Sequence, residues 1–156
     1  MFRTALTIIL AASGALAGTS SPSTTLSACL SSAGLSPVTS SSSAYAADVL
    51  AYNHRLAYKP AAVVYPANAS GVAAAVQCAA SAGVKVAARS GGHSYAANGV
   101  GGQDGSLVVD LKHLTGVTVA ASSQTATFGT GLRLGDLALA LFNNGGQAMA
   151  HGMYIP

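Results

Sequence analysis

The stretch Ala88-Arg89-Ser90-Gly91-Gly92-His93-Ser94-Tyr95 carries more chemical information than any other part of the chain. Two adjacent glycines leave the backbone uncovered, so consecutive N–H groups can turn toward one anion. The serine hydroxyls can donate hydrogen bonds to phosphate oxygens, and Arg89 adds positive charge. The segment therefore predicts a phosphate-binding loop that holds the imidazole of His93 beside the bound group. A tight glycine turn with a surface histidine is the simpler alternative, and these residues alone favour it.

The residues before this loop predict a strand–helix–strand unit. Residues 62–65 form a short β-branched run between Pro60 and Pro66, which is typical of a strand. Asn68 or Ser70 can cap a helix that runs to about residue 82, and residues 84–88 form a second strand. We expect the two strands to be parallel. The loop would then lie at the carboxyl edge of a sheet, where α/β proteins bind ligands.

The residues after the loop continue this mixed pattern. Residues 107–111 predict a buried strand, residues 117–119 and 125–128 a hairpin, and residues 133–143 an amphipathic helix. The glycines of residues 129–135 are similar to a dinucleotide fingerprint, but the third glycine comes one residue late and no acidic residue follows about 20 residues on. A turn that packs a helix closely explains them better. The chain stops at Pro156 in the middle of an expected element, so we expect a fragment or a truncated protein.

Composition and the N-terminal residues favour a secreted protein. Only 7% of the 156 residues are charged, against about 25% in ordinary soluble domains. The net charge of +3 comes from scattered residues, so neither composition nor pattern indicates a nucleic-acid partner. After Arg3, residues 5–16 form an apolar segment that ends in a small-x-small pattern, which predicts a signal peptide over residues 1–17. A membrane anchor would need about 20 apolar residues, and we expect no membrane partner.

The remaining candidate sites depend on an oxidising, extracellular setting. Cys29 and Cys78 are the only cysteines, and there we expect one disulfide between them. Asn68 begins the glycosylation sequon Asn-Ala-Ser. Residues 18–57 are rich in serine and threonine and predict a mostly extended arm, with a short helix at residues 45–52. No metal site is expected, because the other three histidines do not share a helix face; they are His54, His113 and His151.

Five segments together resemble a known family. Residues 60–66, 79–86, 89–95, 107–111 and 131–136 are similar, in this order, to the FAD-binding domain of the vanillyl-alcohol oxidase and p-cresol methylhydroxylase superfamily. The branch most like it is the secreted fungal group around glucooligosaccharide oxidase and berberine bridge enzyme-like proteins. The resemblance covers roughly residues 26–152. It implies an α+β fold with α/β sub-domains, in which residues 58–156 form an incomplete p-cresol methylhydroxylase-type FAD-binding domain.

The resemblance also implies roles for single residues. The loop from Arg89 to Tyr95 would surround the FAD pyrophosphate, and His93 would be bonded covalently to the 8α-methyl group of the flavin. The cysteine pair would match a structural disulfide of the family. Many members attach the flavin a second time through a cysteine, but Tyr154 stands at that position here. A second covalent bond is therefore not expected.

The family reaction takes a hydride from a carbohydrate or alcohol and passes electrons to oxygen, forming hydrogen peroxide. The substrate domain and the catalytic base of the family would follow Pro156, so no catalytic residue is assigned. One alternative is a non-catalytic truncated secreted protein of the same family that binds FAD weakly or not at all. Another is a secreted wall-associated protein, which the low charge and the serine-rich arm would suit.

Overall fold

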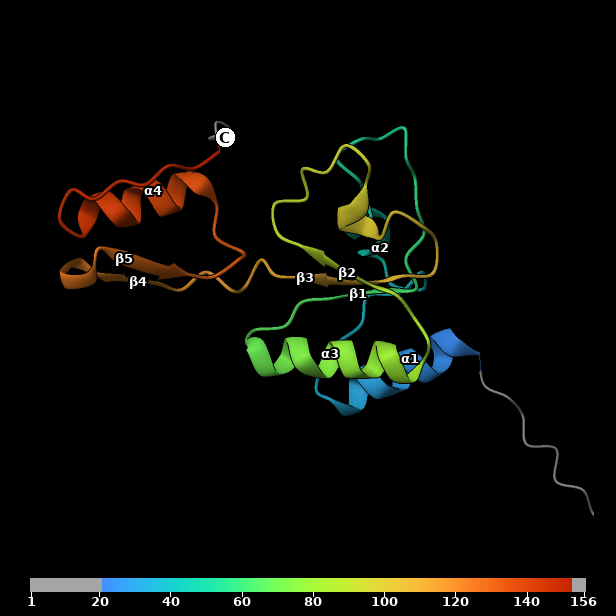
Figure 1. Ribbon diagram of the computed structural model, residues 1–156. Coiled ribbons are helices and arrows are strands. Elements are labelled where there is room, and N and C mark those ends of the chain that lie inside the picture. Colours follow the sequence, from blue (N-terminus) through green and yellow to red (C-terminus); the bar gives the residue numbers. More distant parts are fainter. Residues whose placement is uncertain (1–20, 153–156) are drawn as a thin grey trace, which may run out of the picture.

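The computed structural model describes residues 21–152. The expected signal peptide and Tyr154 lie outside this range. The described part contains two units of secondary structure, which lie at opposite ends of the molecule (Figure 1). The helices are α1 (Pro22–Ser32), α2 (Tyr45–Asp48), α3 (Ala69–Ser81), α4 (Leu134–Asn143) and the short 3₁₀ turns at Asn98–Val100 and Ala121–Ser123; the strands are β1 (Ala62–Val64), β2 (Val86–Arg89), β3 (Leu107–Asp110), β4 (Val117–Ala120) and β5 (Thr125–Phe128).

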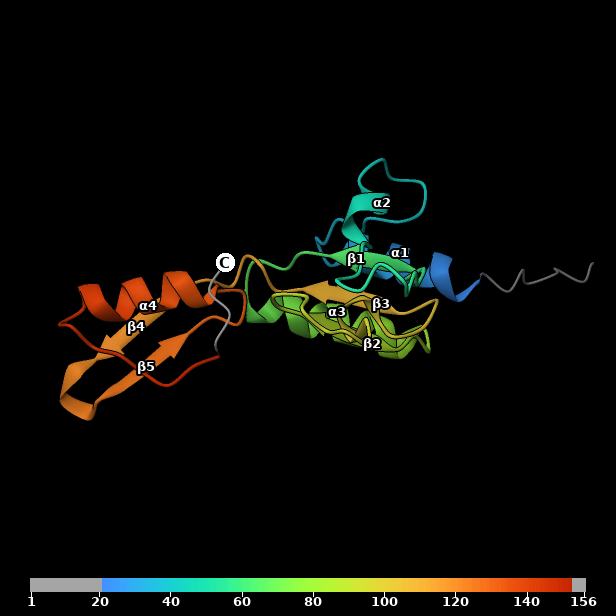
Figure 2. The same ribbon diagram turned by 90° about the horizontal axis from the view of Figure 1, so that it is seen from above.

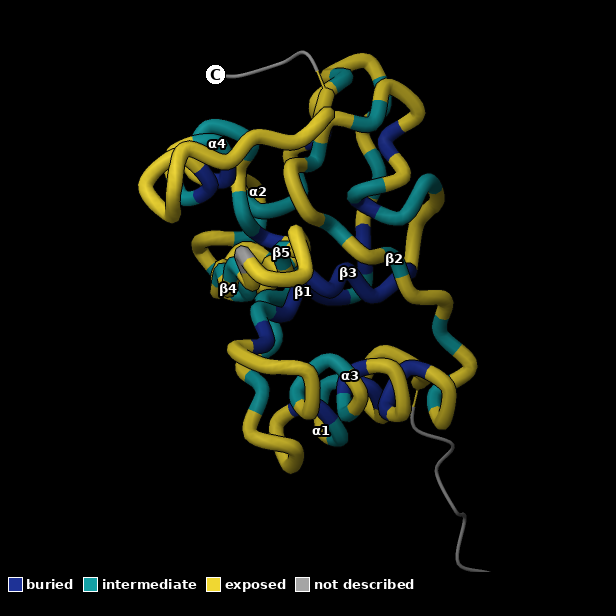
Figure 3. Tube along the Cα trace, turned by 60° about the vertical axis from the view of Figure 1, so that its left-hand side comes forward, coloured by how far each residue is buried: buried dark blue, intermediate teal, exposed yellow. Residues whose placement is uncertain are grey.

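A three-stranded parallel sheet forms the centre of the first unit. Its order is β1-β3-β2, so the last strand in sequence pairs with both of the others. The predicted strand–helix–strand unit is confirmed as β1-α3-β2, with parallel strands that have β3 between them. All residues of β1 and β3 are buried, and most of them are the branched apolar residues typical of a parallel strand covered on both faces (Figure 3).

Helices α1 and α3 cover one face of this sheet, and α2 lies on the other face with the long loops (Figures 1 and 2). Helix α3 begins at Asn68, whose side-chain oxygen accepts a hydrogen bond from the Gly71 N–H at 2.9 Å. This confirms one of the two predicted caps. Between the helices and the sheet lies the main hydrophobic core, which includes Leu26, Leu30 and Leu107, each fully buried.

The expectation of a mostly extended arm is wrong for residues 22–32, which form α1. Ser21 caps this helix and Pro22 occupies its first turn, where a missing N–H costs nothing. Leu26 and Leu30, one helical turn apart, are buried against α3, and each burial stabilises the fold by about 1.5–3 kcal/mol. Tertiary packing therefore overrides the weak helix preference of the serine-rich sequence.

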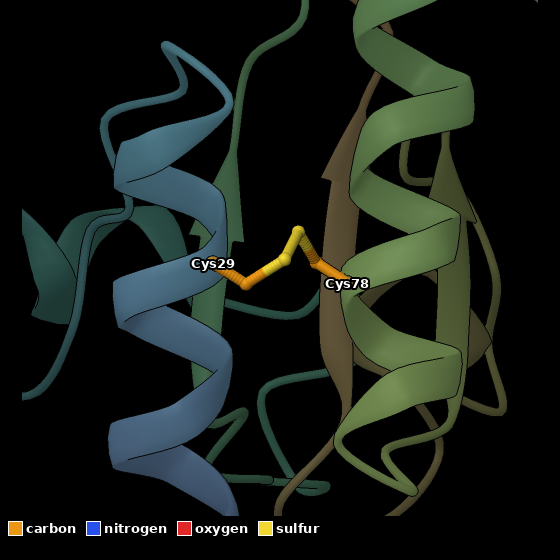
Figure 4. Close-up of a disulfide and its surroundings, with 2 residues drawn as sticks. All are labelled: Cys29 and Cys78. Atoms are coloured by element: carbon orange, nitrogen blue, oxygen red, sulfur yellow. A yellow bond between two sulfur atoms is a disulfide. The ribbon is translucent and has the colours of Figure 1, made fainter.

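A disulfide joins Cys29 of α1 to Cys78 of α3, as predicted (Figure 4). The two Cα atoms are 5.6 Å apart, and 49 positions separate the residues in sequence. Closing a loop of that length stabilises the fold by about 4 kcal/mol in the chain-entropy model.

The second unit consists of the hairpin β4-β5 with α4 packed on it (Figure 1). The hairpin is antiparallel, as predicted, and Leu137 and Leu141 of α4 are buried on it. Gly129 and Gly131 lie in the connection to α4, where an added Cβ would overlap the carbonyl oxygens of Leu114 and Leu111. Close backbone packing thus accounts for these glycines. Within residues 21–152, no helix has both the length and the apolar content to cross a membrane.

Candidate functional site

The glycine–histidine loop, residues 90–95, leaves the carboxyl end of β2, as the sequence predicts. The backbone N–H groups of Gly91, Gly92 and Ser94 make no hydrogen bond to any residue within 21–152. Such groups are the donors that a phosphate needs. The structure therefore leaves a row of N–H donors at the edge where a ligand is expected.

The backbone conformation of Gly92 and the close neighbours of Gly91 both favour glycine. Gly92 has a φ of +77°, a conformation that a residue with a Cβ rarely adopts. A Cβ added at Gly91 would lie 3.0 Å from Nη1 of Arg133 and 3.1 Å from Cδ2 of His93. The missing side chains therefore let the loop backbone approach the imidazole and a cation closely. This arrangement fits a pyrophosphate group of FAD.

Arg89 fixes the start of the loop. Its Nε donates to Oδ2 of Asp110 at 2.6 Å, and its Nη1 donates to the backbone carbonyl of Asp48, also at 2.6 Å. The two ionised side chains are only 12% and 9% exposed, so little water screens the pair. Asp110 also accepts from the Lys112 N–H at 2.9 Å and so caps the turn that follows β3. Much of the Arg89 charge is thus balanced inside the protein.

The two serines of the loop use their hydroxyl groups differently. Ser90 donates to the carbonyl oxygen of Thr130, which ties the loop to the chain before α4. The Ser94 hydroxyl oxygen accepts from the Asn98 N–H at 3.2 Å. Its hydrogen therefore remains available for a phosphate oxygen.

His93 lies on the surface of the loop among aromatic rings. The Tyr52 ring is 4.9 Å from the imidazole, measured between centroids and tilted by 36°. Tyr95 contacts Tyr52 edge-on, with 5.2 Å between centroids, and is 75% exposed. The Asn53 side chain donates to the Tyr95 carbonyl at 2.9 Å. The imidazole is exposed to a ligand on one side and lies against Tyr52 on another.

A polar cavity of about 230 Å³ lies beside the start of the loop. It is lined by both acidic and basic side chains, among them Asp48, Arg89, Asp110, Lys112 and Arg133. The Tyr65 hydroxyl, also in the lining, is buried and has no hydrogen-bond partner within residues 21–152. Burial, with the nearby Asp48 carboxylate, raises the pKa of this phenol, while the ammonium of Lys112 lies 3.8 Å from the centre of its ring.

The structure brings the predicted loop residues together and adds neighbours that sequence reasoning missed. Tyr52, Asn53 and Arg133 all approach the loop from distant positions in the chain. The remaining histidines are exposed; His113 lies edge-on to Tyr65 and His151 contacts the Gly152 carbonyl. Within the described residues, no group of three or more His, Cys, Asp or Glu side chains is arranged to hold a metal ion.

A parallel sheet that ends in a glycine-rich loop of free N–H groups is suited to bind the phosphates of a nucleotide cofactor. Residues 60–156 match the family described as FAD binding domain, and the chain belongs to this family. It is 43% identical over 124 residues to a xylooligosaccharide oxidase of Thermothelomyces thermophilus, covering 80% of this chain and 25% of that protein. It is 40% identical over 127 residues to a glucooligosaccharide oxidase of Sarocladium strictum, covering 81% and 25%.

Solved structures agree with these sequence relatives. The structure of the Acremonium strictum glucooligosaccharide oxidase, whose description names a 6-S-cysteinyl, 8α-N1-histidyl FAD, superposes with a TM-score of 0.76 at 40% identity, covering 82% of this chain and 27% of that one. These matches agree with the family model and with a FAD-binding domain of the p-cresol methylhydroxylase-type fold. The chain spans about a quarter of the length of the curated relatives it matches.

Proposed function

We propose that this chain forms part of the flavin domain of a secreted oxidase, and that FAD is attached to it covalently through His93. The observation that carries the proposal is the exposed imidazole beside a loop of free N–H groups. The N–H groups of Gly91, Gly92 and Ser94 would bind the pyrophosphate, with the Ser94 hydroxyl as a further donor. Ser90, Arg89 and Tyr95 complete the predicted loop, the first two by fixing its start.

Attachment would link a ring nitrogen of His93 to the 8α carbon of the flavin. Attachment would replace one N–H bond of the imidazole and one C–H bond of the 8α-methyl group with an N–C bond, and dioxygen, the oxidant of the proposed oxidase, would take up the two hydrogens as hydrogen peroxide. The role of the protein is to hold the imidazole next to the methyl group. A covalent bond also prevents loss of the cofactor outside the cell.

We further propose that the whole protein oxidises a carbohydrate or alcohol. When bound, the flavin accepts a hydride from the substrate and passes the electrons to oxygen. The substrate class rests on relatives whose names include xylooligosaccharide, chitooligosaccharide and glucooligosaccharide oxidase. In this chain the residues of the loop bind and orient the cofactor. Charged side chains line the polar cavity beside the loop.

Secretion through residues 1–17 and glycosylation at Asn68 belong to the same proposal. Asn68 is exposed, and its Oδ1 accepts from the Gly71 N–H and the Ser70 hydroxyl at 2.9 and 2.7 Å. These bonds use only the side-chain oxygen and none of the hydrogen bonds within residues 21–152 uses the side-chain nitrogen, which would carry the sugar. Loss of mass after enzymatic removal of N-linked glycans from secreted protein would test this.

Covalent attachment can be tested on the purified chain after incubation with FAD. Protein is precipitated with acid, washed and examined for flavin absorbance and for fluorescence in a denaturing gel. We expect a yellow precipitate and a fluorescent band, both abolished in His93→Ala. The matched control is His54→Ala, which removes an exposed histidine that lines no part of the loop and should leave the bound flavin unchanged.

A colourless wild-type precipitate would refute attachment and favour the alternative, a non-catalytic member of the family with weak or no FAD binding. Flavin retained in His93→Ala would show attachment at another residue. For the proposed reaction, hydrogen peroxide release on addition of an oligosaccharide or alcohol to the whole protein is the measurement. No release with any of these substrates would contradict the proposed oxidase.

A further inference from the structure

We infer that Tyr52 is a positioning residue for His93, which holds the imidazole in the orientation that flavin attachment requires. This inference rests on the proposed attachment at His93. Tyr52 belongs to the N-terminal arm and precedes Ser90, the first residue of the loop, by 38 positions. The contact between Tyr52 and His93 is the observation that carries it.

The arm residues 48–53, called here the arm segment, contact the loop at both of its ends. At the start, the Asp48 carbonyl accepts from Nη1 of Arg89 at 2.6 Å. At the other end, the Asn53 side chain donates to the Tyr95 carbonyl at 2.9 Å. Between these two points, the Tyr52 ring lies 4.9 Å from the His93 ring. The arm segment therefore contacts the chain just before the loop, at the middle of the loop and at its last residue.

The backbone of the arm segment is itself fixed. Ala51 is buried, 7% exposed, in a small cluster with Ala97 and Val100, each 2% exposed. Because Ala97 and Val100 directly follow the loop, this cluster joins the arm segment to the chain just beyond Tyr95. Tyr52 is thus placed by a packed neighbour, although its own ring is 47% exposed. The ring gains a second constraint from its edge-on contact with Tyr95, at 5.2 Å.

A fixed ring matters because the chain around His93 is exposed and permissive in conformation. His93 is exposed and follows two glycines, whose backbone is the most permissive of any residue. A bond forms readily only when the reacting atoms are held close and aligned, and a displacement of about 1 Å can slow a reaction about 100-fold. A flat ring against the imidazole limits its rotation, which fixes the direction of the ring nitrogen that would bond to the flavin.

The test compares three variants of the full chain with wild type. Tyr52→Leu removes the ring, Tyr52→Phe keeps the ring without its hydroxyl, and Tyr58→Leu removes a tyrosine that packs on the Ala51 cluster. Two quantities are measured: the rate at which acid-stable flavin forms with excess FAD, and the NMR shifts of the His93 ring protons without FAD. His93→Ala identifies those proton signals by their absence.

We expect Tyr52→Leu to form covalent flavin roughly 10- to 100-fold more slowly than wild type. It should also lose the ring-current shift of the His93 protons. Tyr52→Phe should retain both the rate and the shift, and Tyr58→Leu should keep the shift. A slower rate in Tyr52→Leu together with an unchanged free energy of unfolding in urea separates positioning from a role in stability.

The two proposals fail in different ways. Covalent flavin in wild type with an equal rate in Tyr52→Leu overturns the positioning role and leaves the attachment site intact. His93 proton shifts that are the same in Tyr52→Leu and wild type overturn it as well. No covalent flavin in wild type overturns attachment at His93, and with it any role of Tyr52 in that reaction.

Discussion

Removing the carboxylate of Asp110 is expected to destabilise the sheet and release the start of the flavin loop. In Asp110→Ala the Arg89 guanidinium loses the partner it contacts at 2.6 Å and remains in a site where its side chain is only 12% exposed. Breaking a buried ion pair by removing one partner costs about 3–5 kcal/mol. Because some water reaches this pair, we take the lower value, about 3 kcal/mol.

The same substitution removes a second interaction. The Lys112 N–H, which donates to Asp110 at 2.9 Å, loses its acceptor, at a cost of about 1 kcal/mol. The expected loss is therefore about 4 kcal/mol out of a typical total of about 5–15 kcal/mol. Urea unfolding followed by far-ultraviolet circular dichroism measures the free energy of unfolding directly.

Two further variants separate charge from other effects. Asp110→Asn keeps the shape and an acceptor oxygen, so its loss should be smaller than that of Asp110→Ala. Asp136→Ala removes an exposed carboxylate in the first turn of α4 and should cost only about 0.3–1 kcal/mol. If Asp110→Ala loses no more than Asp136→Ala, the Arg89–Asp110 pair does not hold this sheet edge as described. In a double-mutant cycle, Arg89→Ala and Asp110→Ala should show a coupling of about 1–3 kcal/mol.

Three other perturbations have defined outcomes. The double variant Cys29→Ser/Cys78→Ser should lose about 4 kcal/mol of unfolding free energy in urea; an unchanged midpoint would contradict the stabilising role of the disulfide. Gly91→Ala should lower the yield of acid-stable flavin, because the added Cβ meets the His93 ring at 3.1 Å, whereas Gly83→Ala, with φ +66° and open space around it, should reduce stability but not flavin yield. Burial raises the pKa of Tyr65 and Tyr45 in the folded protein. The contribution of these two phenols to the free energy of unfolding is therefore complete below a pH of about 10, the unfolded pKa, and is lost as pH rises through the folded pKa. In absorbance at 295 nm we expect a late-ionising fraction that shrinks in Tyr65→Phe; ionisation of all tyrosines in one step near the ordinary pKa would refute this.

The parts of the fold that sequence reasoning predicted are those with local signals. Valine pairs mark β1 and β3, and Asn68 marks the start of α3 through its own side chain. Helix α1 was missed because its serine and threonine content resembles a flexible arm. Its two buried leucines stabilise the helix through contact with α3, and no local sequence pattern indicates that contact.

The candidate site divides in the same way. The loop was predicted because its glycines, serines and histidine are adjacent in sequence. Its partners were not predicted, since Asp48 and Asn53 contact the loop across 41 and 42 positions of sequence. Such contacts depend on how the arm returns over the sheet. The Arg89–Asp110 pair was missed for the same reason, because it forms only once β2 and β3 are in register.

The order of the strands also determines when this domain can assemble during synthesis. Strands β1 and β2 each pair only with β3, so a growing chain that has not yet reached Leu107 contains two strands without a common partner. The cysteines both precede that point. Oxidation can therefore join α1 to α3 before the sheet forms. The linked helix pair then offers a surface on which the central strand, β3, can pack. Parallel pairing of strands that are distant in sequence is slow. An early disulfide reduces the number of chain conformations that must be searched before the strands pair.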